Sequence, residues 1–186
     1  MKNIVLIGFM GTGKTTVGRL LAKQLEWSFV DLDKEIEAAC GMVVSRIFDE
    51  HGEDFFRQCE SEAIKRLSQC TRTVIATGGG AVLRDENIDH LRQCGILVRL
   101  KAQPEVIVSR VENEQHVTRP LLNQPDRLQV VTKLLTERQA RYELADISVD
   151  TDNNTPDEVA QKIKSLCRIP DQKSFRFQLV PVWLGM

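Results

Sequence analysis

Eight residues near the start of the chain form a phosphate-binding motif. The stretch Gly8-Phe9-Met10-Gly11-Thr12-Gly13-Lys14-Thr15 fits the pattern G-x-x-x-x-G-K-[ST]. Gly8 and Gly13 permit backbone angles that a Cβ would forbid, so the loop N–H groups can point inward at an anion. Lys14 can reach the β- and γ-phosphates of a nucleotide, and the Thr15 hydroxyl can ligate Mg²⁺. The motif predicts binding of a nucleoside triphosphate.

The segments on either side of this motif fit the same interpretation. Residues 3–7 are a short apolar run, typical of a buried strand. After the loop, four apolar residues fall on one helical face: Val17, Leu20, Leu21 and Leu25. A strand, a glycine-rich phosphate-binding loop and a helix in this order direct the helix N-terminus at a phosphate group. A glycine-rich turn that precedes a helix by chance is the weaker alternative.

The composition is that of a globular domain. The chain has 186 residues, of which 42% are hydrophobic and 27% charged, which favours one domain with a substantial core. A net charge of −1 indicates no electrostatic surface for nucleic acid. No apolar run has the length of a membrane span, and the first strand begins at once, which leaves no room for a signal peptide.

Cysteine usage predicts a reducing compartment. The five cysteines are odd in number and contain no C-x-x-C pair, a pattern that argues against disulfides and zinc. The three histidines are widely separated and favour surface or capping roles. We therefore expect a cytoplasmic protein that associates with neither nucleic acid nor membrane, and we expect a monomer.

Apolar runs alternate with helical patterns along the chain, which predicts an α/β fold. Strands are expected at 3–7, 28–30, 73–76, 95–100 and 147–150. Helices are expected after the P-loop and at 34–40, 46–50, 53–67, 85–93, 104–111, 126–145 and from 156. This alternation is typical of a parallel sheet covered on both faces. We predict a P-loop NTPase-type three-layer α/β/α sandwich with a five-stranded parallel sheet. The expected domain is 1–168, with a lid at about 112–125 and a tail, 169–186, of unassigned role.

Further polar residues are expected at the carboxyl ends of the strands, where open parallel sheets bind ligands. Asp31 and Asp33 are two residues apart, so in an extended chain both would face the same side. A kinase needs one carboxylate near Mg²⁺ and one near the acceptor hydroxyl. Asp31 is the better candidate for the metal, although it could simply cap the following helix. Gly78, Gly79 and Gly80 can present bare N–H groups to an anionic or hydroxyl-rich ligand.

Four arginines are candidates for binding carboxylate or phosphate. Arginine favours bidentate capture of such groups, although a single arginine is more often a solvated surface residue. The four are Arg57, Arg110, Arg119 in the expected lid, and Arg138.

The combination of motifs resembles the shikimate kinase family. The matching stretches are the P-loop, Asp31-Leu32-Asp33, Phe56-Arg57-Gln58-Cys59-Glu60, Gly78-Gly79-Gly80-Ala81-Val82, Arg119-Pro120-Leu121-Leu122, and Arg138 with Tyr142. The P-loop alone marks a superfamily, whereas D-x-D, F-R-x-x-E, G-G-G-A and R-P-L-L in this order are far more specific. The resemblance extends from residue 1 to about residue 167.

The resemblance implies an activity and a role for each matching residue. It implies phosphorylation of the 3-hydroxyl of shikimate by ATP with Mg²⁺, giving shikimate 3-phosphate and ADP. The implied catalytic residues are Lys14, Asp33 and Arg119. The implied nucleotide-binding residues are Gly11, Thr12, Gly13, Lys14, Thr15, Thr16, Arg110, Arg119, Asn154 and Pro156. Shikimate would be held by Asp33, Arg57, Gly79, Gly80 and Arg138, and Mg²⁺ by Thr15 with Asp31.

Two positions depart from the family pattern, and two alternative functions stay open. Ala140 stands where the family usually has proline, and Asn153 or Asn154 where an adenine-side arginine is common. A kinase of the same fold could instead act on gluconate or on a nucleoside monophosphate. A non-catalytic nucleotide switch is a second alternative, but it would not require the acceptor-side groups.

Overall fold

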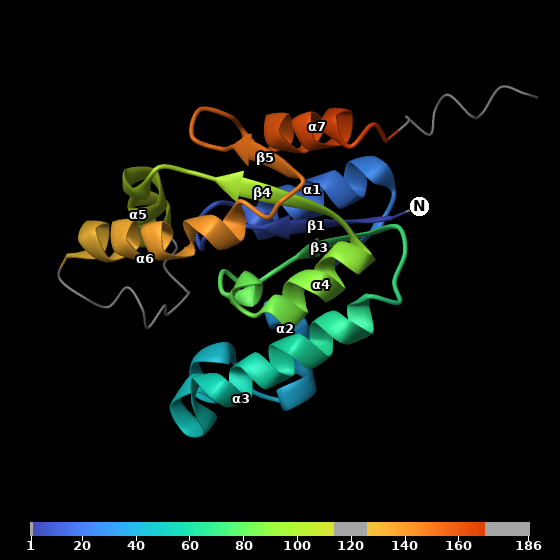
Figure 1. The fold of residues 1–186 in the computed structure, drawn as a ribbon. Coiled ribbons are helices and arrows are strands. Elements are labelled where there is room, and N and C mark those ends of the chain that lie inside the picture. The colour runs from blue at the N-terminus through green and yellow to red at the C-terminus, as the bar shows by residue number, and fades with distance from the viewer. Residues whose placement is uncertain (1, 114–125, 170–186) are drawn as a thin grey trace, which may run out of the picture.

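A five-stranded parallel sheet runs through the centre of the molecule, and helices cover both of its faces (Figure 1). The computed structural model describes residues 2–113 and 126–169. The strands are β1 (Asn3–Ile7), β2 (Ser28–Asp31), β3 (Thr73–Ala76), β4 (Gly95–Lys101) and β5 (Ile147–Asp150). The helices are α1 (Lys14–Leu25), α2 (Leu32–Cys40), α3 (Val44–Leu67), the 3₁₀ turn η1 (Ala81–Leu83), α4 (Asp85–Cys94), α5 (Pro104–Asn113), α6 (Arg127–Tyr142) and α7 (Pro156–Leu166). The predicted three-layer α/β/α sandwich is confirmed.

The order of the strands places β1 in the middle of the sheet. The order is β2-β3-β1-β4-β5, and all four neighbouring pairs are parallel. All five residues of β1 are buried, which explains its continuous apolar sequence. The strand order reverses direction at β1, so the loop after this strand lies at the topological switch point, where such sheets bind ligands.

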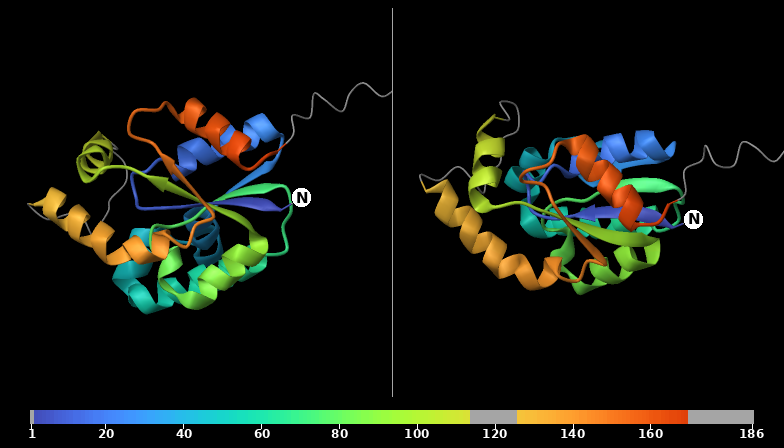
Figure 2. Two further views of the ribbon diagram at one scale, coloured as in Figure 1. Left: turned by 45° about the horizontal axis from the view of Figure 1, so that its top comes forward. Right: turned by 90° about the horizontal axis from the view of Figure 1, so that it is seen from above.

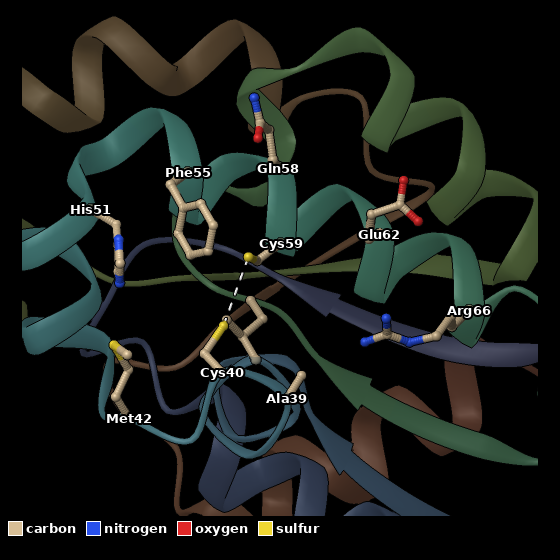
Figure 3. A pocket seen from close by; sticks show the side chains of 10 residues that line it. Ala39, Cys40, Met42, His51, Phe55, Gln58, Cys59, Glu62 and Arg66 are labelled. Carbon is tan, nitrogen blue, oxygen red and sulfur yellow. Dashed lines mark hydrogen bonds between the residues drawn. The ribbon is translucent and has the colours of Figure 1, made fainter.

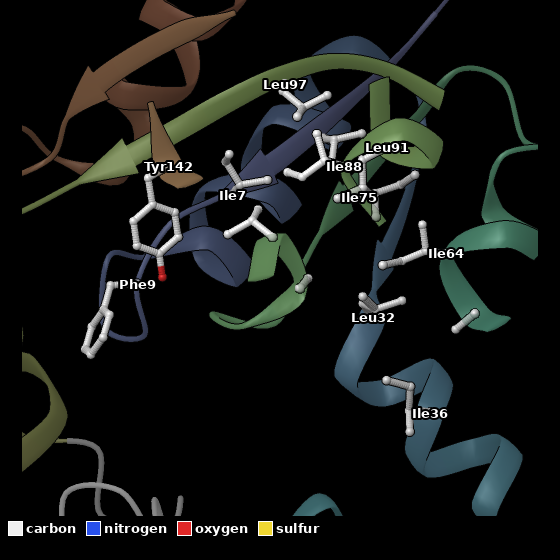
Figure 4. Close-up of a cluster of buried hydrophobic side chains, with 14 of the residues drawn as sticks. Ile7, Phe9, Leu32, Ile36, Ile64, Ile75, Ile88, Leu91, Leu97 and Tyr142 are labelled. Carbon is white, nitrogen blue, oxygen red and sulfur yellow. The ribbon is translucent and has the colours of Figure 1, made fainter. Parts of the chain in front are cut away.

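The helices divide into two layers, one on each face of the sheet (Figure 2). α1 and α7 pack side by side on one face, against Ile4 and Leu6 of β1. α2, α3, α4 and Tyr142, the last residue of α6, contribute to the core on the other face, with Val5 and Ile7 (Figure 4). Alternate residues of β1 thus anchor both layers. No helix in the described ranges is both long and apolar enough to cross a membrane.

Most predicted elements are present, but several boundaries differ. α2 begins at Leu32, directly after β2, with Asp31 as its N-cap. The two helices expected on either side of Gly52 form one element, α3, with a kink at that glycine (φ 80°, ψ 174°). The helix start expected at residue 46 is wrong, because α3 already begins at Val44, without a side-chain cap. α5 continues to Asn113, and the remainder of the expected lid, 114–125, lies outside the described residues.

Candidate active site

The P-loop connects β1 to α1 and closes tightly on itself. Gly8, Gly11 and Gly13 all have positive φ angles, of 139°, 74° and 88°. A Cβ added at Gly8 would collide with the carbonyl oxygen of Leu100, so this position requires glycine for space as well as for conformation. Lys14 as a residue is only 8% exposed, and its ammonium group donates hydrogen bonds to the carbonyl oxygens of Gly8 and Phe9 at 2.9 and 2.8 Å.

The N-terminus of α1 provides the donors expected of a phosphate site. The helix begins at Lys14, and its N-cap, Gly13, makes no side-chain capping bond. No acidic residue occupies the first turn. Thr15 and Thr16 follow and are exposed. The first N–H groups of a helix lack partners within the helix and carry its positive dipole end, so this turn favours an anion such as a phosphate.

Thr15 and Asp31 lie together at the ends of β1 and β2. The Thr15 hydroxyl donates to Asp31 Oδ2 at 2.8 Å. Asp31 Oδ1 also accepts a bond from the Lys34 N–H at 3.4 Å, so Asp31 caps α2 and faces the P-loop at the same time. A hydroxyl and a carboxylate are hard oxygen ligands of the kind that Mg²⁺ prefers. The pair therefore fits the expected magnesium site.

Asp33 reaches the site in a different way from the one that the sequence suggested. It lies in the first turn of α2 and not in an extended chain, so the argument from alternating side chains is wrong. Instead, the start of the helix turns the Asp33 carboxylate toward residues 78–80, which we call the glycine loop. A Cβ added at Gly78 would lie 2.8 Å from Asp33 Oδ1 and 3.0 Å from Glu60 Oε1. The carboxylates of Asp33 in α2 and Glu60 in α3 therefore both lie beside Gly78.

Two glutamates hold the guanidinium group of Arg57. Glu60 accepts from Arg57 Nη1 at 2.7 Å, and Glu53 accepts from Nε and Nη2 at 3.2 and 3.0 Å. The Glu60 side chain is fully buried, and among the described residues its Oε1 has no hydrogen-bond partner. Burial raises the pKa of Glu60, the Arg57 charge acts against this, and Asp33 raises it further. A Cβ at Gly80 would lie 2.6 Å from Arg57 Nη1, so glycine lets the guanidinium lie directly on the loop.

Arg138 lies near the same loop, next to Tyr142. The Tyr142 hydroxyl donates to the carbonyl oxygen of Gly79 at 2.7 Å. Burial raises the pKa of Tyr142, while the nearby charges of Arg138, Arg99 and Arg57 act against the increase. The Arg138 guanidinium also lies 5.7 Å from the centre of the Phe9 ring in the P-loop. Arg57 and Arg138 therefore approach one region from α3 and α6.

Gly79 lies where the glycine loop packs against the P-loop. A Cβ at this position would lie 3.3 Å from the N atom of Met10 and 3.7 Å from the carbonyl oxygen of Gly8. The middle of the glycine loop therefore packs against the P-loop. Its flanking residues, Gly78 and Gly80, face the carboxylates and Arg57. A molecule bound over this loop lies between a phosphate site and a cluster of charged side chains.

A separate group of residues lies where the base of a nucleotide is expected. Arg110 of α5 donates to the carbonyl oxygen and the hydroxyl of Thr151 at 2.6 and 2.9 Å, and to Gly11 O at 3.4 Å. The segment after Thr151 contains Asn154, whose amide donates to Asp150 O, and Pro156, the first residue of α7. Arg110 therefore connects the P-loop to the segment that carries Asn154 and Pro156.

Comparisons with known proteins identify the family. A family model described as shikimate kinase matches residues 10–168. The chain belongs to the shikimate kinase family. The shikimate kinase of Thermodesulfovibrio yellowstonii is 51% identical over 163 residues, which cover 88% of this chain and 93% of that protein. The family expected from the motifs is thereby confirmed.

Solved shikimate kinase structures share the fold. The enzyme from Acinetobacter baumannii, in complex with shikimate, superposes with a TM-score of 0.85 at 36% identity, covering 96% of each chain. The enzyme from Aquifex aeolicus gives a TM-score of 0.75 at 34% identity, covering 89% of this chain and 96% of that one. The parallel α/β/α architecture described above is therefore that of the shikimate kinase family.

In this shikimate kinase family member, the predicted site residues lie around the P-loop and residues 78–80 or, for Asn154 and Pro156, in the segment that Arg110 connects to the P-loop. Arg119 is the exception, because it lies outside the described residues. The sequence interpretation assigned no role to Glu60 or Tyr142, although both stood within the matching motifs. Their spacing from the arginines was an available signal, since residues three or four apart share a helix face. Glu60 follows Arg57 by three positions, and Tyr142 follows Arg138 by four.

Proposed function

We propose that this chain transfers the γ-phosphoryl group of ATP to the 3-hydroxyl group of shikimate, giving shikimate 3-phosphate and ADP. As a member of the shikimate kinase family, it is an ATP-dependent kinase. One observation carries the assignment of the site. The glycine loop contacts the P-loop at Gly79 and the Asp33, Glu60 and Arg57 cluster at Gly78 and Gly80. An acceptor held by this cluster lies next to the phosphates of a nucleotide.

Phosphoryl transfer depends on positioning and on stabilisation of charge, with little covalent chemistry from the protein. In our proposal the N-terminus of α1 and the P-loop N–H groups hold the phosphates. The Lys14 ammonium, which now donates to two loop carbonyls, turns to the transferring group when the nucleotide binds. Arg119 adds a second positive charge, a role that stays a prediction because the residue is outside the described ranges.

Thr15 and Asp31 are the proposed ligands of Mg²⁺. Their oxygens are 2.8 Å apart and belong to the two ligand types that this ion favours. The bound ion would neutralise negative charge on the β- and γ-phosphates. Asp31 keeps its place through its second oxygen, which caps α2.

Charged side chains on the opposite side of the glycine loop are proposed to hold the acceptor. Arg57 and Arg138 bind the carboxylate of shikimate, and Glu60 keeps the Arg57 guanidinium in place. Asp33 binds the ring hydroxyls and accepts the proton of the attacking 3-hydroxyl. Gly79 and Gly80 allow the substrate to approach the backbone closely. No serine or cysteine nucleophile is needed for this reaction.

The remaining parts of the proposal concern the nucleotide and the cell. Arg110, Asn154 and Pro156 border the adenine of ATP, next to the P-loop. The domain boundaries of 1–168, the lid at about 112–125 and the tail from 169 stay predictions from the sequence. A cytoplasmic location and a monomeric state stay predictions from the composition and cysteine usage.

A comparison of acceptors tests the proposed reaction. ADP release is measured with Mg²⁺–ATP and, in parallel, shikimate, quinate, gluconate and nucleoside monophosphates. We expect kcat/KM to be highest for shikimate, because two arginines match its carboxylate and Asp33 its hydroxyls. A higher value with gluconate or a nucleoside monophosphate would refute the acceptor assignment, and ADP release independent of any acceptor would favour a nucleotide switch.

A further inference from the structure

A pocket of about 440 Å³ opens between α2 and α3 (Figure 3). Apolar side chains make up part of its lining, among them Ile36, Met42 and Phe55. Two thiols also line it, Cys40 at the end of α2 and Cys59 in α3. The Cys40 thiol donates to Cys59 Sγ at a distance of 3.8 Å between the sulfurs. None of the residues predicted to bind nucleotide or shikimate lines this pocket.

The two thiols are close enough to react with each other and open enough to be reached. Both side chains are partly exposed. A disulfide needs about 2.0 Å between the sulfurs, so Cys40 and Cys59 must approach by less than 2 Å. They come from two helices that already pack against each other. The pocket gives a small reagent access to both sulfurs from one side.

We propose that Cys40 and Cys59 form a redox modification site that takes a low-molecular-weight disulfide as its oxidant. Burial and the neighbouring Cys40 thiol raise the pKa of Cys59. In the proposed sequence of steps, Cys40 reacts first. Its thiolate attacks the small disulfide, forming a mixed disulfide and releasing one small thiol. The Cys59 thiolate then attacks Cys40 Sγ and displaces the second small thiol. The two cysteines are oxidised by two electrons, and their two protons leave on the two small thiols.

The new bond would act on the helices that carry the acceptor side of the proposed site. Asp33 lies in the first turn of α2, and Cys40 is the last residue of that helix. In α3, Arg57 precedes Cys59 by two residues and Glu60 follows it directly. A bond that draws Cys59 toward α2 therefore shifts the turn that holds Arg57 and Glu60. This consequence rests on the proposed function, whereas the formation of the bond does not.

Peptide mapping tests whether the bond forms. The full-length protein is incubated in mixtures of reduced and oxidised glutathione, alkylated with N-ethylmaleimide and digested with trypsin without reduction. We expect the peptides 35–46 and 58–65 to be joined, with the loss of two hydrogens, and to separate after dithiothreitol treatment. Cys167→Ser should behave like the wild type, and Cys59→Ser should not form the link. Complete alkylation of both cysteines in every mixture, or only mixed disulfides with glutathione, would overturn the proposal.

Kinetics test the effect on the acceptor side. We expect oxidation to change the KM for shikimate at least threefold, to leave the KM for ATP within twofold, and to be reversed by dithiothreitol. Cys40→Ser and Cys59→Ser should be active and insensitive to the oxidant. A linked enzyme with an unchanged KM for shikimate would refute the coupling to the acceptor side. If the reduced enzyme failed to phosphorylate shikimate, the proposed function would fall, while the mapping would still decide the disulfide.

Discussion

The phosphate side of the site is built from one continuous stretch, whereas the acceptor side is assembled from distant segments. Residues 8–15 connect β1 to α1, and the Lys14 ammonium bonds to carbonyl oxygens of the same loop. The acceptor side takes Asp33 from α2, Arg57 from α3 and Arg138 from α6. The first side relies on backbone groups in a fixed loop, and the second on the relative positions of charged side chains. Substitutions on the two sides should therefore change different kinetic parameters.

Removal of the Lys14 charge should have the largest effect. We expect Lys14→Ala to lose at least about 10³-fold in kcat, because no other P-loop side chain supplies a positive charge to the transferring phosphoryl group. The measurement is steady-state ADP release, with circular dichroism to confirm the fold. Lys23→Ala, an exposed lysine in the same helix, is the matched control and should be unaffected. Normal turnover by folded Lys14→Ala would refute the P-loop assignment.

Asp33 and Asp31 separate the acceptor side from the metal. Asp33→Asn keeps the shape but cannot take a proton, so kcat with shikimate should fall at least about a hundredfold while ATP still binds. Asp31→Asn should instead raise the Mg²⁺ concentration needed for half-maximal rate. Both variants are titrated with Mg²⁺ at saturating shikimate. Rescue of Asp33→Asn by excess Mg²⁺, without rescue of Asp31→Asn, would exchange the two roles.

The arginines should affect binding of the acceptor more than the nucleotide. Loss of one partner of a buried charged contact costs about 2–5 kcal/mol, and each 1.4 kcal/mol is about tenfold. Arg57→Ala or Arg138→Ala should therefore raise the KM for shikimate at least about tenfold, with smaller changes for ATP. Arg46→Ala is the control, because this arginine of α3 is exposed and, within residues 2–113 and 126–169, is paired with Glu50 alone. A larger change in the KM for ATP would show that these arginines are wrongly assigned to the acceptor side.

The smallest expected effect is the pH dependence of stability caused by Glu60. Burial raises its pKa above the ordinary value of 4.5, although Arg57 opposes the shift. A raised pKa in the folded state adds stability that is full below pH 4.5 and is lost as the pH rises through the folded pKa. The free energy of unfolding of the wild type, relative to Glu60→Gln, should therefore fall as the pH rises above 4.5. Urea unfolding measures the free energy of unfolding of both proteins. If the difference between them rose with pH, the effect of Arg57 on the pKa of Glu60 would outweigh that of burial.

The same contrast explains how much could be predicted from the sequence. The P-loop and its flanking strand and helix were predictable because their signals are local: fixed glycines, an apolar strand and an apolar helix face. The start of α7 at Pro156 was equally local, because Thr155 and Glu158 form a capping box there, and it is confirmed. The helix expected from residue 46 instead begins at Val44, without a side-chain cap. Helix boundaries depend on packing that a short window of sequence does not contain.

The acceptor side could be predicted only in part. The residue types were found through the motif resemblance, but their contacts depend on how α2, α3 and the glycine loop pack together. Asp33 illustrates the limit, since the expected extended spacing is replaced by the first turn of a helix. The contact between Gly79 and the P-loop joins residues about 70 positions apart in the chain. Nothing in the local sequence encodes that approach.

The position of β1 in the sheet has a consequence for how the protein folds. Its two neighbours are β3 and β4, so β1 has no strand partner until residues 73–76 and 95–101, which follow it in the chain, are made. Parallel pairings over such sequence separations form slowly, because the closure of long loops comes before the contacts that stabilise them. β1 and the loop that follows it therefore reach their native surroundings only after the chain has been translated as far as residue 101.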